Sequence, residues 1–142
     1  MGRLCTSPGS NGFATDVCVP ISRLAECVED TIADIAAHDL TAPNHGRVGD
    51  GNFHVLPLAM PDDTEMQAKI GAFSSRLSER AIPLGGTCTG EHGIGQGKTA
   101  YLRAEMGDSV DVMADIKATF DPKHILNPSK LFGQSCLGKS LR

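Results

Sequence analysis

The sequence of 142 residues contains no tryptophan and one tyrosine, so aromatic residues make up only 4% of it. Surfaces that stack nucleotide bases need several aromatic side chains, and proteins that bind nucleic acids usually carry an excess of basic residues. The net charge here is −4. No apolar run approaches the roughly 20 residues that a membrane-spanning helix requires. The sequence therefore excludes nucleic acid from the expected partners and predicts no transmembrane segment.

Several common signatures are missing as well. The five cysteines include no CxxC pair, and the first residues lack the long apolar stretch of a secretory signal, so we expect reduced thiols and a cytoplasmic protein. Gly97-Lys98-Thr99 resembles the end of a phosphate-binding P-loop, but His92 stands where that motif needs glycine. The GxGxxG fingerprint of dinucleotide-binding folds is also absent.

Hydrophobic periodicity predicts the order β-α-β-β-α-loop-α-α, which is an α+β arrangement. Residues 16–19 form the expected first strand, and a helix follows from Ser22, which suits the N-cap position. The expected second helix starts at Pro61-Asp62-Asp63 and ends before Pro83. The side chains expected on the buried faces of these two helices are Leu24, Val28, Ile32 and Ile35, and Met66, Ile70, Phe73 and Leu77.

The remaining helices are expected near the end of the chain. Residues 98–106 predict a short helix that Gly107 closes, and Asp108 suits the N-cap of the next one. The side chains expected to face inward from this last helix are Val112, Met113, Ile116 and Phe120. Residues 1–13 are rich in glycine, serine and proline and lack periodicity, so we expect a disordered terminus before a single domain at 14–142.

A glycine-rich stretch, residues 85–98, surrounds the adjacent Glu91 and His92. Glycine lets a backbone approach a ligand closely at an entropic cost, so such density seldom serves packing alone. Glu91 offers an oxygen ligand or an acid–base group, and His92 offers a base near neutral pH. Consecutive side chains on extended backbone point apart, so one could face a metal while the other faces a substrate.

A second stretch of interest spans residues 46–54, and Asp50-Gly51 within it is a strong signal for a two-residue hairpin turn. That turn would place Arg47 directly opposite His54, with their Cβ atoms about 5 Å apart. In the alternative, a continuous strand, these two side chains face opposite ways because their separation in the sequence is odd.

The residue types alone leave two chemical hypotheses open. In the first, His54 and Glu91 are ligands for zinc, iron or manganese, with Asp50 or His45 as further candidates. In the second, the same histidine and carboxylate act as a general base without any metal.

Three separated motifs resemble those of the FAD-linked oxidases of D-2-hydroxy acids, above all the cytochrome-linked D-lactate dehydrogenases and the flavin subunit of glycolate oxidase. The motifs are GRVGDGNFH at 46–54, GGTCTGEHGIG at 85–95 and DPKHILNPSK at 121–130. They follow the family's order, and the likeness covers about residues 15–132. The resemblance implies a ferredoxin-like α+β cap domain with a C-terminal helical tail. It also implies an oxidoreductase, a flavoprotein that oxidises a small 2-hydroxy acid, most simply D-lactate to pyruvate, by hydride transfer to FAD.

The same resemblance implies roles for single residues. His54 and Glu91 would be metal ligands, and His92 would be the base that takes the proton of the substrate hydroxyl. Asn127 would lie in a tail that returns toward the flavin domain, which makes it the expected cofactor-binding residue. Arg47 stands where the family has a histidine ligand. Because arginine stays protonated, it would weaken the binding of zinc or manganese and could instead hold the substrate carboxylate.

Family members carry a large FAD-binding domain before the matching region, and this sequence does not contain one. We therefore expect an FAD-binding domain or subunit as a partner, and an isolated chain that is inactive. The alternative is a degenerate cap that acts as a binding or regulatory module, or a truncated gene product, without catalysis of its own.

Overall fold

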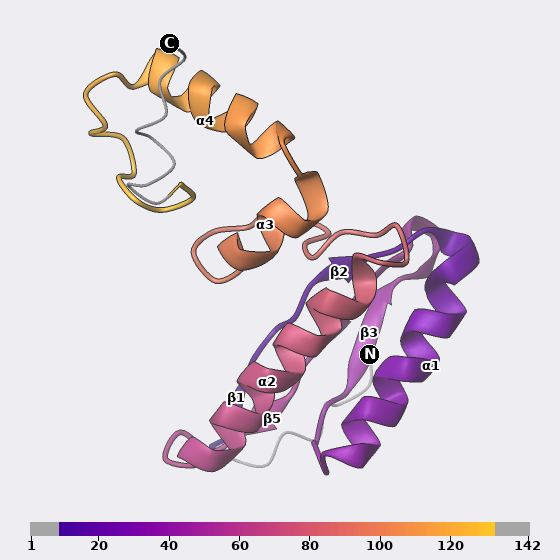
Figure 1. Cartoon of the computed structure of the whole chain (residues 1–142). Helices are drawn as coiled ribbons and strands as arrows, with labels where there is room; N and C mark the ends of the chain where they lie inside the picture. The colour runs from indigo at the N-terminus through magenta and orange to yellow at the C-terminus, as the bar shows by residue number, and fades with distance from the viewer. Residues whose placement is uncertain (1–8, 133–142) are drawn as a thin grey trace. The chain divides into compact units, whose positions relative to one another are not determined.

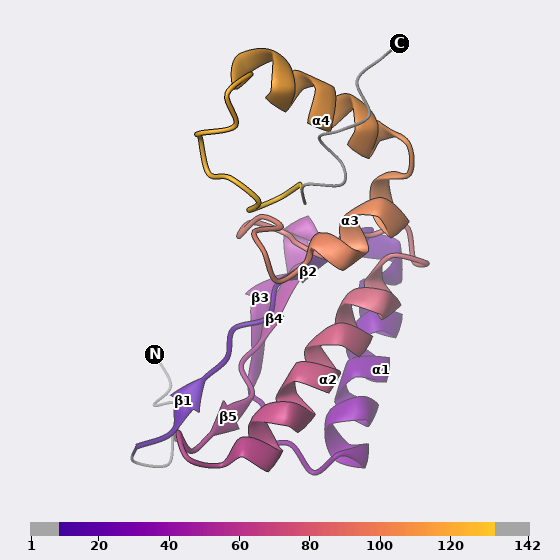
Figure 2. The same cartoon turned by 60° about the vertical axis from the view of Figure 1, so that its left-hand side comes forward.

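The computed structural model describes residues 9–132, which divide into two compact units on either side of the His92–Gly93 bond. Figures 1 and 2 show the helices and strands of these units. The sequence predicts one domain over residues 14–142, and this domain assignment stays a prediction. Residues 1–8 of the expected disordered terminus lie outside the described residues, whereas Asn11–Gly12 forms a paired strand.

The first unit contains two antiparallel sheets and two long helices. The larger sheet has the order β2-β4-β3, and its strands span Val17–Cys18, Asn52–Val55 and Asn44–Arg47. The smaller sheet pairs β1 (Asn11–Gly12) with β5 (Leu58–Ala59). The helices α1 (Ile21–Ala37) and α2 (Thr64–Ala81) lie side by side in both views.

The core of this unit combines side chains from the larger sheet and from both helices. Phe53 and Val55 enter it from β4, and Phe73 and Leu77 enter it from α2. The other members of the core are Val17, Val19, Leu24, Cys27, Leu40, Ala59, Ile70 and Ala81. Side chains alternate along a strand, so His54, which lies between Phe53 and Val55, points to the opposite face of the sheet, as do the residues that flank this pair.

Helix α2 follows its predicted pattern. The carboxylate of Asp63 accepts a hydrogen bond from the backbone N–H of Met66 at 2.9 Å, which caps the first turn. The expected stripe is confirmed at Ile70, Phe73 and Leu77, which are all buried. Met66 is partly buried and packs against the same core.

The prediction for helix α1 is wrong in two details. Pro20, and not Ser22, occupies the N-cap position, and no side chain caps the helix. Ile32 is 50% exposed although the pattern places it inward. The buried residues of α1 are Leu24, Cys27, Thr31 and Asp34. Leu24 is buried and Val28 and Ile35 pack against the core as predicted, while Asp34 turns inward to meet two arginines of α2.

The hairpin between β3 and β4 corrects the predicted register. The connection is a 3-10 turn, η1 (Val48–Asp50), closed by Gly51 with a φ of 73°. The turn is thus longer than the expected two residues, and Arg47 lies opposite Asn52 instead of His54. His45 is the residue that lies opposite His54. The predicted Arg47–His54 pair is therefore not formed.

The second unit contains α3 (Thr99–Met106), α4 (Ser109–Phe120) and the segment that follows them. Gly107 closes α3 as predicted, with a φ of 55°. A small core forms from Leu102, Val110, Ala114 and Phe132, with Ile94 and Met113 packed against it. The expected inward stripe of α4 is confirmed at Met113 but wrong at Val112, Ile116 and Phe120, which are 60%, 54% and 82% exposed. The smaller side chains Val110 and Ala114 face inward instead.

The α+β class is confirmed by these mixed helices and antiparallel sheets. After β2-α1-β3-β4-α2, an isolated antiparallel bridge joins Thr87 to Cys18. This single bridge is too short to count as a strand after α2. The ferredoxin-like fold of the unit therefore stays a prediction. Among the helices of residues 9–132, none is both long and apolar enough to cross a membrane.

Candidate functional site

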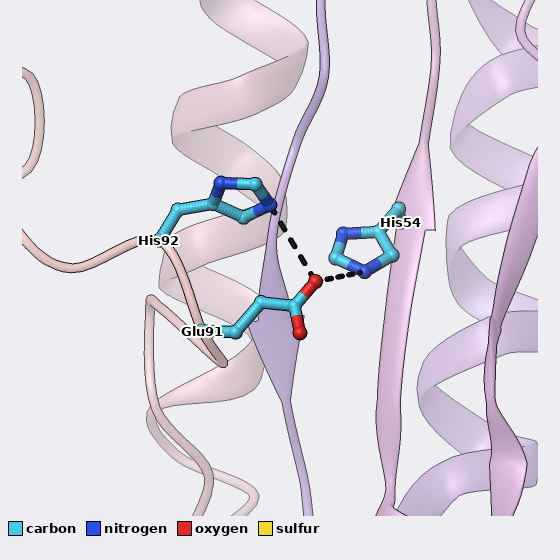
Figure 3. A group of neighbouring side chains, drawn as sticks. All are labelled: His54, Glu91 and His92. Atoms are coloured by element: carbon cyan, nitrogen blue, oxygen red, sulfur yellow. Dashed lines mark ion pairs between the residues drawn. The ribbon is translucent and has the colours of Figure 1, made fainter.

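Three side chains with metal-ligating or acid–base atoms converge in the first unit, as Figure 3 shows. His54 Nε2 lies 3.4 Å from Glu91 Oε1, and His92 Nε2 lies 3.7 Å from the same oxygen. One ligand atom from each residue lies within 4.8 Å of the others. The structure thus brings together the three residues that the sequence singles out as ligands and base.

Strand geometry places His54 at this site. Its neighbours Phe53 and Val55 are buried in the core, so alternation turns His54 to the other face of the sheet. The imidazole is nevertheless only 11% exposed, whereas the carboxylate of Glu91 is 42% exposed and the ring of His92 61% exposed. The site therefore has one enclosed member and two that solvent or a ligand can reach.

The backbone of Thr15 fixes the orientation of His54. Nδ1 of His54 lies 2.9 Å from the carbonyl oxygen of Thr15, which can only accept a hydrogen bond. Nδ1 therefore carries a hydrogen, and in the neutral ring Nε2 presents its lone pair to Glu91. The hydroxyl of Thr15 also donates to the carbonyl of Val55 and accepts from its N–H, which fixes this segment against β4.

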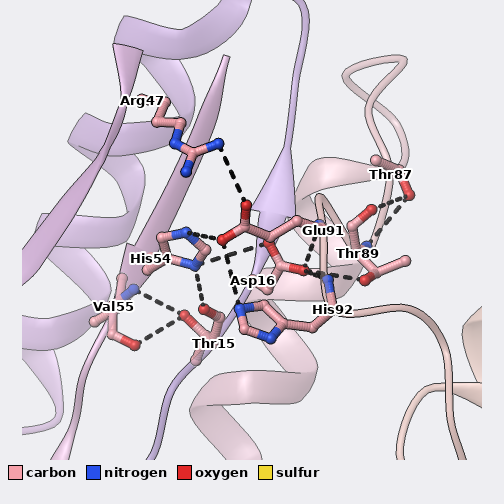
Figure 4. Close-up of polar contacts among 9 residues, drawn as sticks. All are labelled: Thr15, Asp16, Arg47, His54, Val55, Thr87, Thr89, Glu91 and His92. Atoms are coloured by element: carbon pink, nitrogen blue, oxygen red, sulfur yellow. Dashed lines mark hydrogen bonds and ion pairs between the residues drawn. The ribbon is translucent and has the colours of Figure 1, made fainter. Parts of the chain in front are cut away.

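A buried carboxylate, Asp16, holds the loop that carries Glu91 and His92 (Figure 4). Its Oδ2 accepts hydrogen bonds from the backbone N–H groups of Glu91 and His92, both at 2.8 Å, and from the hydroxyl of Thr89 at 3.0 Å. Its Oδ1 lies 3.7 Å from Nδ1 of His54. The sequence analysis places Asp16 in a strand and gives it no role in the site.

Gly90 allows this close approach of the loop. A Cβ atom on Gly90 would lie 2.7 Å from Oδ1 of Asp16 and 2.7 Å from Oδ1 of Asn52, distances that real Cβ atoms essentially never show. Within residues 9–132, the buried Oδ1 of Asn52 has no hydrogen-bond partner. A side chain at position 90 would therefore push the loop away from β2 and β4.

Arg47 joins the site from β3 by a different route from the one that the sequence predicts. Its Nη1 lies 3.7 Å from Oε2 of Glu91, and its side chain is 73% exposed. The guanidinium thus meets one carboxylate oxygen, Oε2, whereas His54 meets the other, Oε1, as Figure 4 shows. Such an exposed pair contributes little to stability, so the arginine can exchange Glu91 for an anionic ligand at small cost.

His45 is closer to His54 than the sequence predicts. The two residues are directly opposite each other in the β3–β4 ladder, and their ring centroids are 5.2 Å apart. The ring of His92 contacts His54 edge-on at 5.7 Å. The predicted two-residue turn would pair Arg47 with His54, two residues away from the observed register. The contact between His45 and His54 follows only from the longer turn.

Asn127, the expected cofactor-binding residue, belongs to the second unit. It lies in the segment after α4 with a φ of 47°, and His124 and Ser129 also have positive φ values, 52° and 59°. Asp121 holds the start of this segment, since its carboxylate accepts from the N–H groups of Ile125 and Leu126, each at 3.0 Å. Asn127 also lines a cavity of about 150 Å³.

The first unit thus combines a sheet and a helix pair with a His–Glu–His cluster, and sequence comparison identifies its family. Residues 1–131 match the family of FAD linked oxidases, C-terminal domain. The chain therefore belongs to this family.

Its relatives come from animals, bacteria and plants. A protein named probable D-lactate dehydrogenase, mitochondrial, from Danio rerio is 48% identical over 87% of the chain and 25% of the relative. The glycolate oxidase subunit GlcD of Bacillus subtilis is 43% identical over 84% of the chain and 26% of the relative. A D-lactate dehydrogenase [cytochrome], mitochondrial, from Arabidopsis thaliana is 39% identical over 88% and 22%. The chain thus spans about a quarter of the length of these relatives.

Proposed function

We propose that this chain is the substrate- and metal-binding part of an FAD-dependent dehydrogenase of D-2-hydroxy acids, with D-lactate, oxidised to pyruvate, as the first candidate substrate. The convergence of His54, Glu91 and His92 on one carboxylate oxygen carries this proposal. The names of the relatives support the substrate class. FAD bound by another domain or subunit would accept the hydride from C2 of the substrate.

The donor set fits a divalent cation such as Zn²⁺ or Mn²⁺. Nε2 of His54 and Oε1 of Glu91 both present lone pairs to each other at 3.4 Å, an arrangement that a cation or a proton between them stabilises. His54 and Glu91 would hold the metal, and imidazole with carboxylate suits both ions. A bound cation would polarise the substrate hydroxyl and make its proton easier to remove.

His92 is the proposed base. Its ring is 61% exposed, and its Nε2 lies 3.7 Å from Glu91 Oε1, so a substrate hydroxyl held beside Glu91 comes within reach of this nitrogen. Nε2 of His92 would take the hydroxyl proton. Its N–H hydrogen bond to Asp16 fixes the backbone from which the ring extends. His92 as a third metal ligand is the competing role, because its Nε2 belongs to the same cluster.

Arg47 is the proposed partner of the substrate carboxylate. Its guanidinium lies on the open side of Glu91 and is 73% exposed, so it can form a paired hydrogen bond to a carboxylate without leaving a buried position. A 2-hydroxy acid has its hydroxyl next to its carboxylate. Arg47 and His92 on two sides of Glu91 would therefore orient both groups of the substrate.

The proposed partner is an FAD-binding domain or subunit, and the second unit offers a surface for it. Val112, Ile116 and Phe120 follow each other at helical spacing along α4 and are all more than half exposed. Exposed apolar surface of this kind marks an interaction site. Asn127 lies shortly after this helix, and its proposed role is to contact the flavin. The predicted cytoplasmic location stays a prediction, and the printed names of the zebrafish and Arabidopsis relatives say mitochondrial of those proteins.

One observation favours a second function. Arg47 places a positive charge 3.7 Å from Glu91, which opposes a cation at the same carboxylate. In this alternative the chain is a degenerate cap that keeps the fold and serves as a binding or regulatory module. Replacing the arginine separates the two proposals.

The test is the affinity of the purified chain for Zn²⁺ and Mn²⁺, measured by competition with a chelating dye. We expect His54→Ala and Glu91→Gln to abolish measurable binding, and Arg47→His to tighten it by about tenfold or more, because a ligand replaces a repelling charge. His92→Ala should leave the affinity unchanged if His92 is a base and lower it if His92 is a ligand. No binding by wild type and by Arg47→His alike would overturn the metal role.

Activity needs the partner. The chain would be mixed with the FAD-binding part of the zebrafish relative, and reduction of a dye would be followed with D-lactate, L-lactate and glycolate. The expected result is D-lactate-dependent reduction that His92→Ala lowers by about 10²-fold or more. Reduction by the mixture that is equal with and without this chain would favour the regulatory alternative.

A further inference from the structure

Asp16 connects the two halves of the site, although it touches neither the expected metal nor the substrate. One of its oxygens faces the loop that carries Glu91 and His92, and the other faces His54 (Figure 4). Within residues 9–132 its side chain is 4% exposed. A carboxylate that is buried to this extent must be compensated by donors, and here the donors come from the site itself.

The geometry of the contacts shows what Asp16 controls. The three hydrogen bonds to Oδ2 come from the hydroxyl of Thr89 and from two consecutive backbone N–H groups, so they fix the backbone that carries Glu91 and His92. Gly90, between these donors, has no side chain that could hold the loop in place of these bonds. Moving Asp16 would therefore move both loop side chains relative to His54.

The charge of Asp16 acts on His54 as well. Nδ1–H of His54 points to the carbonyl of Thr15 at 2.9 Å and has Oδ1 of Asp16 at 3.7 Å. Acceptors on the Nδ1 side keep the hydrogen on that nitrogen and make Nε2 the ligand atom. A carboxylate also makes the imidazole a better donor to a cation.

We propose that Asp16 is a positioning residue that sets the distance between His54 and the Glu91–His92 pair and keeps Nε2 of His54 available for a cation. This inference rests on the metal role proposed above for His54 and Glu91. Its claim is that removing the Asp16 charge weakens metal binding although the fold and both ligands remain.

The experiment compares the Zn²⁺ affinity of wild type, Asp16→Asn and Thr89→Val in the full chain, by competition with a chelating dye. Asn keeps the size of Asp16 and one acceptor oxygen but removes the charge, and we expect the affinity to fall about 10- to 100-fold. Thr89→Val removes one of the three donors and leaves the charge, so its loss should be much smaller. Equal affinities for wild type and Asp16→Asn would overturn the proposal.

A spectroscopic measurement separates positioning from general structural support. Nitrogen-15 spectra of the histidine rings report which nitrogen of His54 carries the hydrogen. Wild type should show the hydrogen on Nδ1 of His54, and Asp16→Asn should shift this signal while circular dichroism stays unchanged. A His54 signal that does not move, despite weaker Zn²⁺ binding, would contradict the claimed effect on that ring.

Two further variants keep the test decisive if Asp16→Asn does not fold. Gly90→Ala pushes the loop away from Asp16 without changing any charge, and it should lower the affinity for Zn²⁺. Gly97→Ala is the matched control, because a Cβ at Gly97 meets nothing within 4 Å. Equal affinities for these two glycine variants would overturn the positioning role. If His54→Ala binds Zn²⁺ as wild type does, it is the metal proposal itself that fails.

Discussion

Helix α2 buries its large apolar side chains, whereas helix α4 leaves most of its own exposed. In α2, Phe73 and Leu77 are both 0% exposed. In α4, Ile116 is 54% exposed and Phe120 82%, while the small side chain of Ala114 faces inward. Both helices repeat apolar residues at the same three-to-four spacing. Such spacing therefore marks an apolar face, but the surrounding structure decides whether that face is covered.

The apolar face of α2 is buried by other elements of its own unit. It packs against the sheet and against α1, and Asp34 of α1 accepts hydrogen bonds from Arg76 and Arg80 of α2 at 2.7 to 3.1 Å. The inward side chains of α4 meet only a small cluster that includes Leu102 and Phe132. The outer face of α4 is thus largely uncovered within residues 9–132, and it is the surface proposed above for a partner.

The largest expected effect is on the buried helix. Phe73→Ala should lower the free energy of unfolding by about 3–5 kcal/mol, because it removes a fully buried ring and leaves a cavity. Phe120→Ala is the control from α4 and should change the free energy by less than about 0.5 kcal/mol. Urea unfolding followed by circular dichroism measures both. Equal losses for the two variants would show that α4 is covered as well as α2.

A second prediction tests the ionic contact between α1 and α2. Asp34→Asn should cost about 3 kcal/mol, because Arg76 and Arg80 would face a neutral amide in a partly buried position. Burial alone raises the pKa of Asp34, but hydrogen bonds from Arg76 and Arg80 outweigh it and hold the pKa below its ordinary value. The urea midpoint of the variant at pH 7 is the measurement.

The pH dependence follows from that lowered pKa. A carboxylate with a lower pKa in the folded state contributes its full stability above the unfolded pKa of about 3.9. This contribution is lost as the pH falls through the folded-state pKa. The urea midpoint of wild type should therefore drop more steeply in acid than that of Asp34→Asn. Parallel curves for the two proteins would contradict the role of Asp34.

The smallest effect on stability is expected on the outer face of α4. Ile116→Ser should change the free energy of unfolding by less than about 0.5 kcal/mol, because the side chain is already half exposed. It should weaken association with an FAD-binding domain by about fivefold or more, if Ile116 is an anchor of that interface. Calorimetric titration with a purified FAD-binding domain measures this, and Asp115→Ser on the same helix is the control. Unchanged association would place the interface elsewhere.

Local sequence patterns predict the helices of this fold well, but they predict less well how each helix is buried against its neighbours. The Asp63 cap and the stripe of Ile70, Phe73 and Leu77 could be predicted because each depends on residues within a few turns. Helix α1 shows the limit, since Ile32 fits an apolar stripe but is 50% exposed. The inward position of Asp34 on this helix involves a contact with α2, which lies more than 40 residues further on.

The site was predictable to a similar extent. The glycine-rich stretch draws attention to Glu91 and His92, the resemblance to the family adds His54, and the structure places these three residues together. Asp16 was missed because an acidic residue at the start of an apolar run has no local signal for a contact 75 residues away. The position of His45 was missed because register depends on the turn, and a strong two-residue turn signal gave way to the 3-10 turn.

That 3-10 turn determines which residues of β3 lie next to His54. A two-residue shift of the β3–β4 register would exchange His45 for Arg47 beside His54 and leave every side chain on its present face. The shift would also place Val48 opposite Phe53, where Gly46 now lies and where a Cβ atom would come within 2.6 Å of the Cα of Phe53. Contacts outside the site oppose it, since the N–H of Val19 donates to the carbonyl of Gly51 at 3.0 Å and Sγ of Cys18 donates to that of Asp50 at 3.3 Å. Substitutions in this turn would thus change which residue of β3 lies beside His54, although they replace neither His54 nor Glu91.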